Sequence, residues 1–172
     1  MKKILIALVV LGSSFSLSAQ KDNAIDKYFS QYENDTAFAK VKINAKMFEL
    51  FTEMEGSTEE QKAMQETIGK LKGLKMLELD NDPRVEALYK EAIKKMNKNY
   101  EVLMEIEDEE KITFYIDESG GIIKELVMVM GGQNEFMILS LEGDIDLKEI
   151  SKLSKSVNIS GMEKLESVED AE

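Results

Sequence analysis

The segment "LVMVMGGQNEFMILSL", residues 126–141, constrains the fold more than any other part of the sequence. Two apolar runs flank a glycine-rich break at residues 131–134, a pattern that predicts a β-hairpin with positive-φ glycines in its turn. Neither run alternates apolar with polar residues, whereas a hairpin with one face in water would alternate. Both faces of this hairpin therefore need a cover.

A tight turn at this break would pair Val129 with Phe136 and Met128 with Met137. The eight large apolar residues then divide into two faces: Leu126, Met128, Met137 and Leu139 on one, and Val127, Val129, Phe136 and Ile138 on the other. At roughly 25 cal/mol per Å2, four such side chains represent several kcal/mol on each face. The cover is the chain's own helices, a partner protein or an apolar ligand, so these eight residues are the candidate interaction or ligand surface.

Residues 1–19 have the pattern of a secretory signal peptide. Lys2 and Lys3 precede a short apolar run, and Ala19 supplies a small residue for cleavage. The run is too short for a permanent membrane anchor, and no second run of spanning length follows. We therefore expect an exported, periplasmic protein with no transmembrane segment in its mature chain. The absence of cysteine excludes a lipid anchor on cysteine and leaves the fold to packing alone.

Composition excludes several classes of function. The net charge of −12 disfavours binding to nucleic acid, because phosphates would be repelled. There is no histidine and no cysteine, so the usual nucleophilic triads cannot be built. We expect no catalytic residues and no cofactor. A hydrolase built on paired carboxylates is the least favoured hypothesis, because the chain has no tryptophan to line a glycan cleft.

Two sets of residues are candidate metal sites, and we expect neither to bind a metal. Met128, Met130 and Met137 could offer thioethers to Cu(I), but methionine among Leu, Val and Ile more often fills a core. The acidic segments 80–83 and 107–110 could attract Ca2+. The first of them lacks the glycine and the distal glutamate of an EF-hand loop, and the second is a hairpin tip that should be solvated.

Hydrophobic periodicity predicts the order α-β-α-α-β-α-β-β-β-β-α. The expected helices are 25–32, 45–54, 57–73, 82–96 and 146–157, and the expected strands are 38–44, 74–79, 100–107, 111–117 and the two arms of the hairpin. This order predicts an α+β domain, with a largely antiparallel sheet of about six strands and amphipathic helices packed on it. We expect a single domain over residues 20–158 and a loose acidic tail over residues 159–172.

Several local predictions can be checked directly. Met47, Leu50, Phe51 and Met54 should form the buried stripe of their helix. Ser57 and Glu60 should form a capping box for the next helix, and Asp82 should cap the helix that begins at Pro83. Strands 100–107 and 111–117 both alternate, so each should keep one face in water.

The segments "DKYFSQYENDTAF", "INAKMFELF", "KLKGLKMLELD", "YEVLMEIED" and "GGIIKELVMVMGGQNEFMILSLEGDIDLKEISKLSKSV" follow one another in the order of a known family. Over almost the whole mature chain the sequence resembles the exported bacterial family of domain of unknown function 4252. The resemblance implies an envelope location in Gram-negative bacteria. It supplies no agreed activity and no catalytic residues to transfer.

These observations favour a non-catalytic interaction or regulatory module that acts on an unknown envelope protein. A carrier of an apolar or lipidic ligand is the main alternative. In both hypotheses the apolar hairpin is the place where the partner or ligand would lie.

Overall fold

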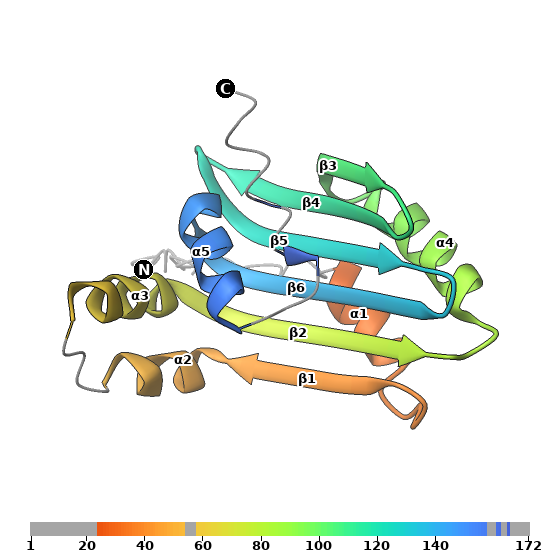
Figure 1. Cartoon of the computed structure of the whole chain (residues 1–172), viewed down its shortest axis with the longest axis horizontal. Coiled ribbons are helices and arrows are strands. Elements are labelled where there is room, and N and C mark those ends of the chain that lie inside the picture. The colour runs from red at the N-terminus through yellow and green to blue at the C-terminus, as the bar shows by residue number, and fades with distance from the viewer. Residues whose placement is uncertain (1–23, 54–57, 158–160, 163–164, 166–172) are drawn as a thin grey trace, which may run out of the picture.

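A computed structural model describes residues 24–53, 58–157, 161, 162 and 165 (Figure 1). The predicted signal peptide, residues 1–19, lies outside these ranges. The element order agrees with the predicted order. The helices are α1 (Ala24–Gln31), α2 (Ala45–Thr52), α3 (Glu59–Gly69), α4 (Val85–Met96) and α5 (Leu147–Val157). The strands are β1 (Ala39–Asn44), β2 (Leu71–Asp80), β3 (Glu101–Glu107), β4 (Lys111–Ser119), β5 (Ile122–Gly131) and β6 (Glu135–Ile145).

The six strands form one sheet in the order β1-β2-β6-β5-β4-β3, and every neighbouring pair is antiparallel. Helices α1 and α4 pack on one face, which we call the α1/α4 face (Figure 1). Residues of α2 and α5 pack on the opposite face, which we call the α5 face. The α+β prediction with its antiparallel sheet is confirmed.

The hairpin forms from the predicted strands, but its register differs from the prediction. Val129 lies opposite Ile138 and Met130 opposite Met137, so the pairing is shifted by two residues. Because side chains alternate with a period of two, this shift leaves every residue on its predicted face. Val127, Val129, Phe136 and Ile138 belong to the core of the α1/α4 face, and Leu126, Met128, Met137 and Leu139 to the core of the α5 face.

The glycines of the hairpin turn have a different role from the predicted one. Positive φ angles occur at Gly120 and Gly121 in the β4–β5 turn but not at Gly131 or Gly132. A Cβ atom on Gly131 would lie only 2.5 Å from the Tyr89 ring. Gly131 is therefore needed so that α4 can approach the end of β5 closely.

Helix α3 differs from the prediction at its start and at its end. The capping box uses Thr58 and Gln61 instead of Ser57 and Glu60: the Thr58 hydroxyl accepts from the Gln61 backbone N–H, and the Gln61 side chain accepts from the Thr58 N–H. The helix ends at Gly69, not near residue 73, and Gly73 lies inside β2 opposite Glu142 and Asn44.

Helix α4 begins at Val85, two residues later than predicted. Asp82 does not act as its side-chain cap, because its carboxylate accepts from the Arg84 backbone N–H and from the Arg84 guanidinium. Asp146, in contrast, accepts from the N–H groups of Lys148 and Glu149 at the start of α5 and so caps this helix.

Burial separates two strands that look alike in sequence. In β4, residues Ile112, Phe114, Tyr115 and Ile116 are all buried, so the prediction of one wet face was wrong for this strand. It lies inside the sheet with helices on both sides. β3 is an outer strand and stays largely exposed, with Val102 at 42% exposure.

The described residues of the acidic C-terminal segment pack against the sheet. Met162 and Leu165 are buried in the core of the α5 face. Gly161 lies so close to Met128 that an added Cβ would approach its sulfur to 3.1 Å. The rest of the segment predicted as a loose tail, residues 159–172, lies outside the described residues.

Candidate functional site

All eight hairpin residues singled out by the sequence lie in the interior. None of them is more than 5% exposed: Leu126, Val127, Met128, Val129, Phe136, Met137, Ile138 and Leu139. Helices α1 and α4 contribute to the core around one set, and α2, α5, Met162 and Leu165 to the core around the other. In this conformation these eight residues offer no surface to a partner, so a binding site has to be sought elsewhere.

The exposed apolar residues of the described chain gather on a short segment at one edge of the sheet. Four of the six large apolar side chains that are exposed lie within β1 and α2: Val41, Met47, Leu50 and Phe51. Their exposed fractions run from 37% to 48%. We call this region, residues 39–52, the β1–α2 surface. Apolar side chains that cluster in this way are typical of interaction sites.

The prediction for α2 was wrong about which side of the helix is buried. Met47, Leu50 and Phe51 were expected to face the core, yet all three are exposed, and Met54 lies outside the described residues. The helix is held by Phe48, which is buried in the core of the α5 face. Phe48 is about 100° around the helix from Met47, so its burial turns the predicted stripe toward solvent.

The direct connection between β1 and α2 fixes this orientation. The side-chain oxygen of Asn44, the last residue of β1, accepts from the Met47 backbone N–H at 3.2 Å and caps the helix. No loop separates the strand from the helix, so α2 has little freedom to rotate its stripe inward. The helix packs against α3, where Thr52 lies beside Gly69.

An open hollow of about 350 Å3 lies where β1 meets α2. Its lining combines apolar and basic side chains: Lys42, Ile43, Asn44, Lys46, Met47 and Leu50. Lys46 forms an ion pair with Glu49 at 2.8 Å, and this hydrogen bond raises the pKa of its ammonium group. Lys42 lies 3.7 Å from the carboxylate of Glu33. The lining of the hollow is thus amphipathic.

A family model for a domain of unknown function, DUF4252, matches residues 32–153. The chain belongs to this family. Comparisons with curated proteins and with solved structures each gave no significant match. The DUF4252 match covers the whole β1–α2 surface and all six strands, whereas α1 lies before it.

Three carboxylates of the DUF4252 sheet lie close enough to hold a cation. Oxygen atoms of Glu78, Asp80 and Glu135 lie within 4.8 Å of one another near the hairpin turn. Burial raises the pKa of Glu135, and the neighbouring charges of Asp80, Glu110 and Glu78 raise it further. Of the acidic segment 80–83 that the sequence suggested, only Asp80 belongs to this cluster. The Asp82 carboxylate accepts hydrogen bonds from the Arg84 guanidinium instead. The main consequence of this arrangement is that the three carboxylates repel one another when they are ionised.

A buried acid was missed at the sequence level. Glu125 is only 6% exposed and accepts hydrogen bonds from Tyr100 at 2.8 Å and from Ser140 at 2.6 Å. Burial raises the pKa of Tyr100, and the Glu125 carboxylate raises it further. Lys75 lies on the same face, between Asp26 and Glu142 at 2.6 Å from each. The signal in the sequence was a lone acid within "IIKELVMVM" at an inward-facing position.

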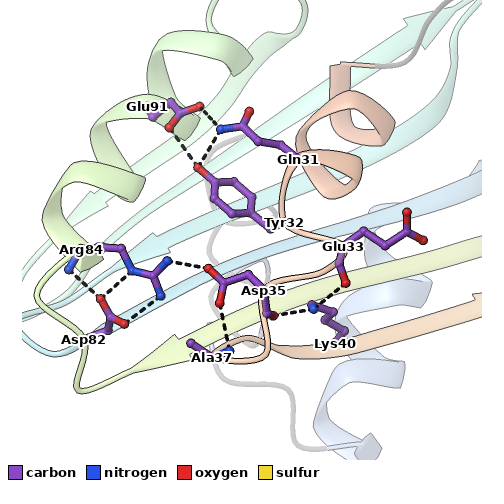
Figure 2. Close-up of polar contacts among 9 residues, drawn as sticks. All are labelled: Gln31, Tyr32, Glu33, Asp35, Ala37, Lys40, Asp82, Arg84 and Glu91. Carbon is purple, nitrogen blue, oxygen red and sulfur yellow. Dashed lines mark hydrogen bonds and ion pairs between the residues drawn. The ribbon is translucent and has the colours of Figure 1, made fainter.

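A polar network joins α1, α4 and the loops before β1 and α4 (Figure 2). Arg84, the single arginine of the chain, binds both Asp82 and Asp35 and lies 5.7 Å from the centre of the Phe38 ring. The Glu91 carboxylate accepts from Tyr32 at 3.1 Å and from Gln31 at 3.3 Å. These contacts hold α1 and its following loop against α4, which is a structural role.

The helices offer no span for a bilayer: none within the described ranges is both long enough and apolar enough to cross one.

Proposed function

We propose that this DUF4252 chain is a non-catalytic interaction module of the cell envelope that binds a protein partner through the β1–α2 surface. The main support is that the apolar stripe of α2, formed by Met47, Leu50 and Phe51, faces solvent. Covering such a side chain fully is worth roughly 1.5–3 kcal/mol relative to leaving it in water. Met47, Leu50 and Phe51 still expose 42–48% of their surface, so a partner that covers all three would gain roughly half of that amount from each.

Two further observations support this proposal. The signal-peptide pattern of residues 1–19 favours an exported, periplasmic protein. The lack of histidine and cysteine leaves few routes to catalysis, and the buried acid Glu125 is bound by Ser140 and Tyr100. Binding is the function that the remaining exposed features support best.

Site-specific cross-linking in the native host tests the proposal. A photoreactive amino acid at Leu50 should yield a discrete cross-linked product that contains a different protein. Ile122 is the matched control, since it is a large apolar residue of similar exposure, 44% against 48%, but lies at the β4–β5 turn. The same reactive group at Ile122 should give no such product.

A second variant shows whether the apolar stripe itself is responsible. Phe51→Glu, combined with the photoreactive group at Leu50, should abolish the product because it places a charge in the contact. The proposal is wrong if Leu50 and Ile122 give the same products, or if Phe51→Glu leaves the Leu50 product unchanged.

The hollow beside α2 supports a second candidate, a carrier of an amphipathic anion such as a fatty acid. Its volume of about 350 Å3 falls within the range of small-molecule sites, and Ile43, Met47 and Leu50 lie near Lys42 and Lys46. Titration with a fluorescent fatty acid would show saturable binding that Leu50→Glu removes. Binding that does not saturate, or that Leu50→Glu leaves intact, would exclude this candidate.

A further inference from the structure

Two outer strands, β1 and β3, bound the sheet of the described residues. β1 pairs with β2 and β3 pairs with β4, and neither has a second neighbour among the described residues. Every pair in the six-strand order is antiparallel, so β1 and β3 run in opposite directions. A second copy placed beside the sheet in the same orientation would bring its β1 against β3 as the next antiparallel strand.

The charged residues of the two edges have opposite sign and lie on the same face. Lys40 lies opposite Leu77, which belongs to the core of the α1/α4 face, and Lys42 shares its side of the strand. On β3, Glu105 lies opposite Thr113 and Glu107 opposite Lys111. Thr113 and Lys111 share a side of β4 with Tyr115, which belongs to the same core, so both glutamates lie on the α1/α4 face. Lysines on one edge thus match glutamates on the other.

The apolar residues of the two edges share the other face. Val41 and Ile43 lie opposite Met76 and Leu74, which pack against the core of the α5 face. Met104 and Ile106 lie opposite Phe114 and Ile112 of that core. A sheet continued from β3 into a second β1 would keep apolar residues beside apolar ones on this face.

One antiparallel register satisfies both patterns at once. It places Lys40 opposite Glu107, Val41 opposite Ile106, Lys42 opposite Glu105, and Ile43 opposite Met104. The matched stretch ends where β3 becomes irregular, since its pairing with β4 shifts between Val102 and Met104. Opposite charges and apolar pairs directly across a sheet are each stabilising, whereas like charges are destabilising.

We propose that copies of this chain associate head to tail, with β1 of one copy pairing with β3 of the next. The proposal goes beyond the proposed function: a second copy occupies the β1 edge, beside the α2 stripe that a different protein would cover. Because the two surfaces are different, the contact repeats along a row of copies and does not close into a symmetric pair. Four residue pairs make a small interface, so the association is weak and depends on concentration.

The same charges disfavour the competing arrangements. Two β1 edges brought together would place lysines against lysines, and two β3 edges would place glutamates against glutamates. Lysine on an exposed strand normally blocks edge-to-edge pairing, and here it would do so against every edge except an acidic one. Three of these charged groups already have partners. Lys40 donates to the backbone carbonyls of Glu33 and Asp35, Lys42 lies 3.7 Å from the Glu33 carboxylate, and Glu107 lies 3.2 Å from Lys111. The pairing adds one further partner to each.

Sedimentation velocity over a range of protein concentrations tests the proposal on the full chain as the host processes it. The average mass should rise with concentration, and salt should reduce this rise because the ion pairs are exposed. Lys42→Glu and Glu105→Lys should each weaken association about tenfold, since each places like charges opposite one another.

A charge swap within one chain gives the decisive comparison. Lys42→Glu/Glu105→Lys should restore association, because the glutamate introduced on β1 of one copy then faces the lysine introduced on β3 of the next. Lys42→Glu/Glu118→Lys is the matched control: it makes the same change in net charge at an exposed residue of β4, and it should not restore association. Circular dichroism of each variant checks that it is folded.

Each outcome decides the proposal. A wild-type mass that does not change with concentration, or a charge swap that behaves like its control, would overturn it. Loss of association in Lys42→Glu but not in Glu105→Lys would show that some other surface meets β1 and would also overturn it. Leu50→Glu should abolish binding of the other protein at α2 and leave self-association unchanged. The two proposals can therefore fail independently of each other.

Discussion

The β5–β6 hairpin and the β1–α2 surface both carry closely spaced large apolar side chains, but their environments are opposite. The hairpin lies in the middle of the sheet with helices on both faces, and its eight apolar residues are buried. β1 lies at the edge, and the helix that follows it exposes Met47, Leu50 and Phe51. The comparison teaches that position in the strand order, and not apolar content, decides which segment is available to a partner.

The largest expected effect contrasts the same substitution in the two regions. Phe136→Ala removes a fully buried ring from the α1/α4 face and should lower the free energy of unfolding by about 3–5 kcal/mol. Phe51→Ala, at 42% exposure, should change it by only about 0.5 kcal/mol. Urea denaturation of both variants measures the difference. Equal losses would show that the α2 stripe is part of the core.

A smaller effect is expected at the end of the hairpin. Gly131→Ala forces a methyl group against the Tyr89 ring and should cost about 1–3 kcal/mol of stability. Gly132→Ala is the matched control, since a Cβ there would meet its nearest atom at 3.6 Å. Thermal denaturation should show a lowered Tm for the first variant alone, and an equal drop in both would contradict the close-approach argument.

The Arg84 network should make part of the stability dependent on pH. Hydrogen bonds from Arg84 lower the pKa of Asp82 to about 2, and Arg84 also lowers the pKa of Asp35. An acid with a lowered pKa stabilises the fold above its usual value near 3.8 and loses that contribution as the pH falls toward 2. Arg84→Ala should lower the Tm at neutral pH and flatten its fall over this range, as Tm measured against pH would show. A curve parallel to wild type would contradict this.

The smallest expected effect has the opposite sign. Glu135→Gln removes one charge from the Glu78, Asp80 and Glu135 cluster and should raise stability by about 0.5 kcal/mol at neutral pH. The pKa of Glu135 is raised, so wild type should regain stability as the pH falls from that raised value toward 4.5. The gain of the variant should therefore shrink over this window in denaturation experiments, and a gain that stays constant would exclude charge repulsion as its cause.

The sequence predicted the element order well, because hydrophobic periodicity specifies the type of each element and which residues of a strand share a face. The order of all the helices and strands was predicted, and so were the two faces of the hairpin. The register was wrong by two residues because the turn lies one position further along the chain, a change that shifts the pairing by two and moves no side chain to the other face. The start of α4 was wrong because Asp82 binds Arg84, a local competition that a capping pattern does not reveal.

The candidate site could not be predicted from the sequence alone. The spacing of Met47, Leu50 and Phe51 gives an amphipathic helix whichever way it faces, and only the position of Phe48 against α5-face residues decides the direction. The complementary edges were equally hidden. Lys42 and Glu105 become related only once β1 and β3 are known to be the two ends of one sheet.

The strand order has a consequence for folding kinetics. β2 pairs with β6 inside the sheet, and residues such as Lys75 and Glu142 meet across 67 positions of the chain. The four strands β3 to β6 form a meander of local contacts, but β1 and β2 can join the sheet only after β6 has been made. Loop closure over such a separation slows the formation of a sheet. Strands β1 and β2, with the exposed helix α2 between them in the chain, therefore take their places in the sheet only after β6 has formed.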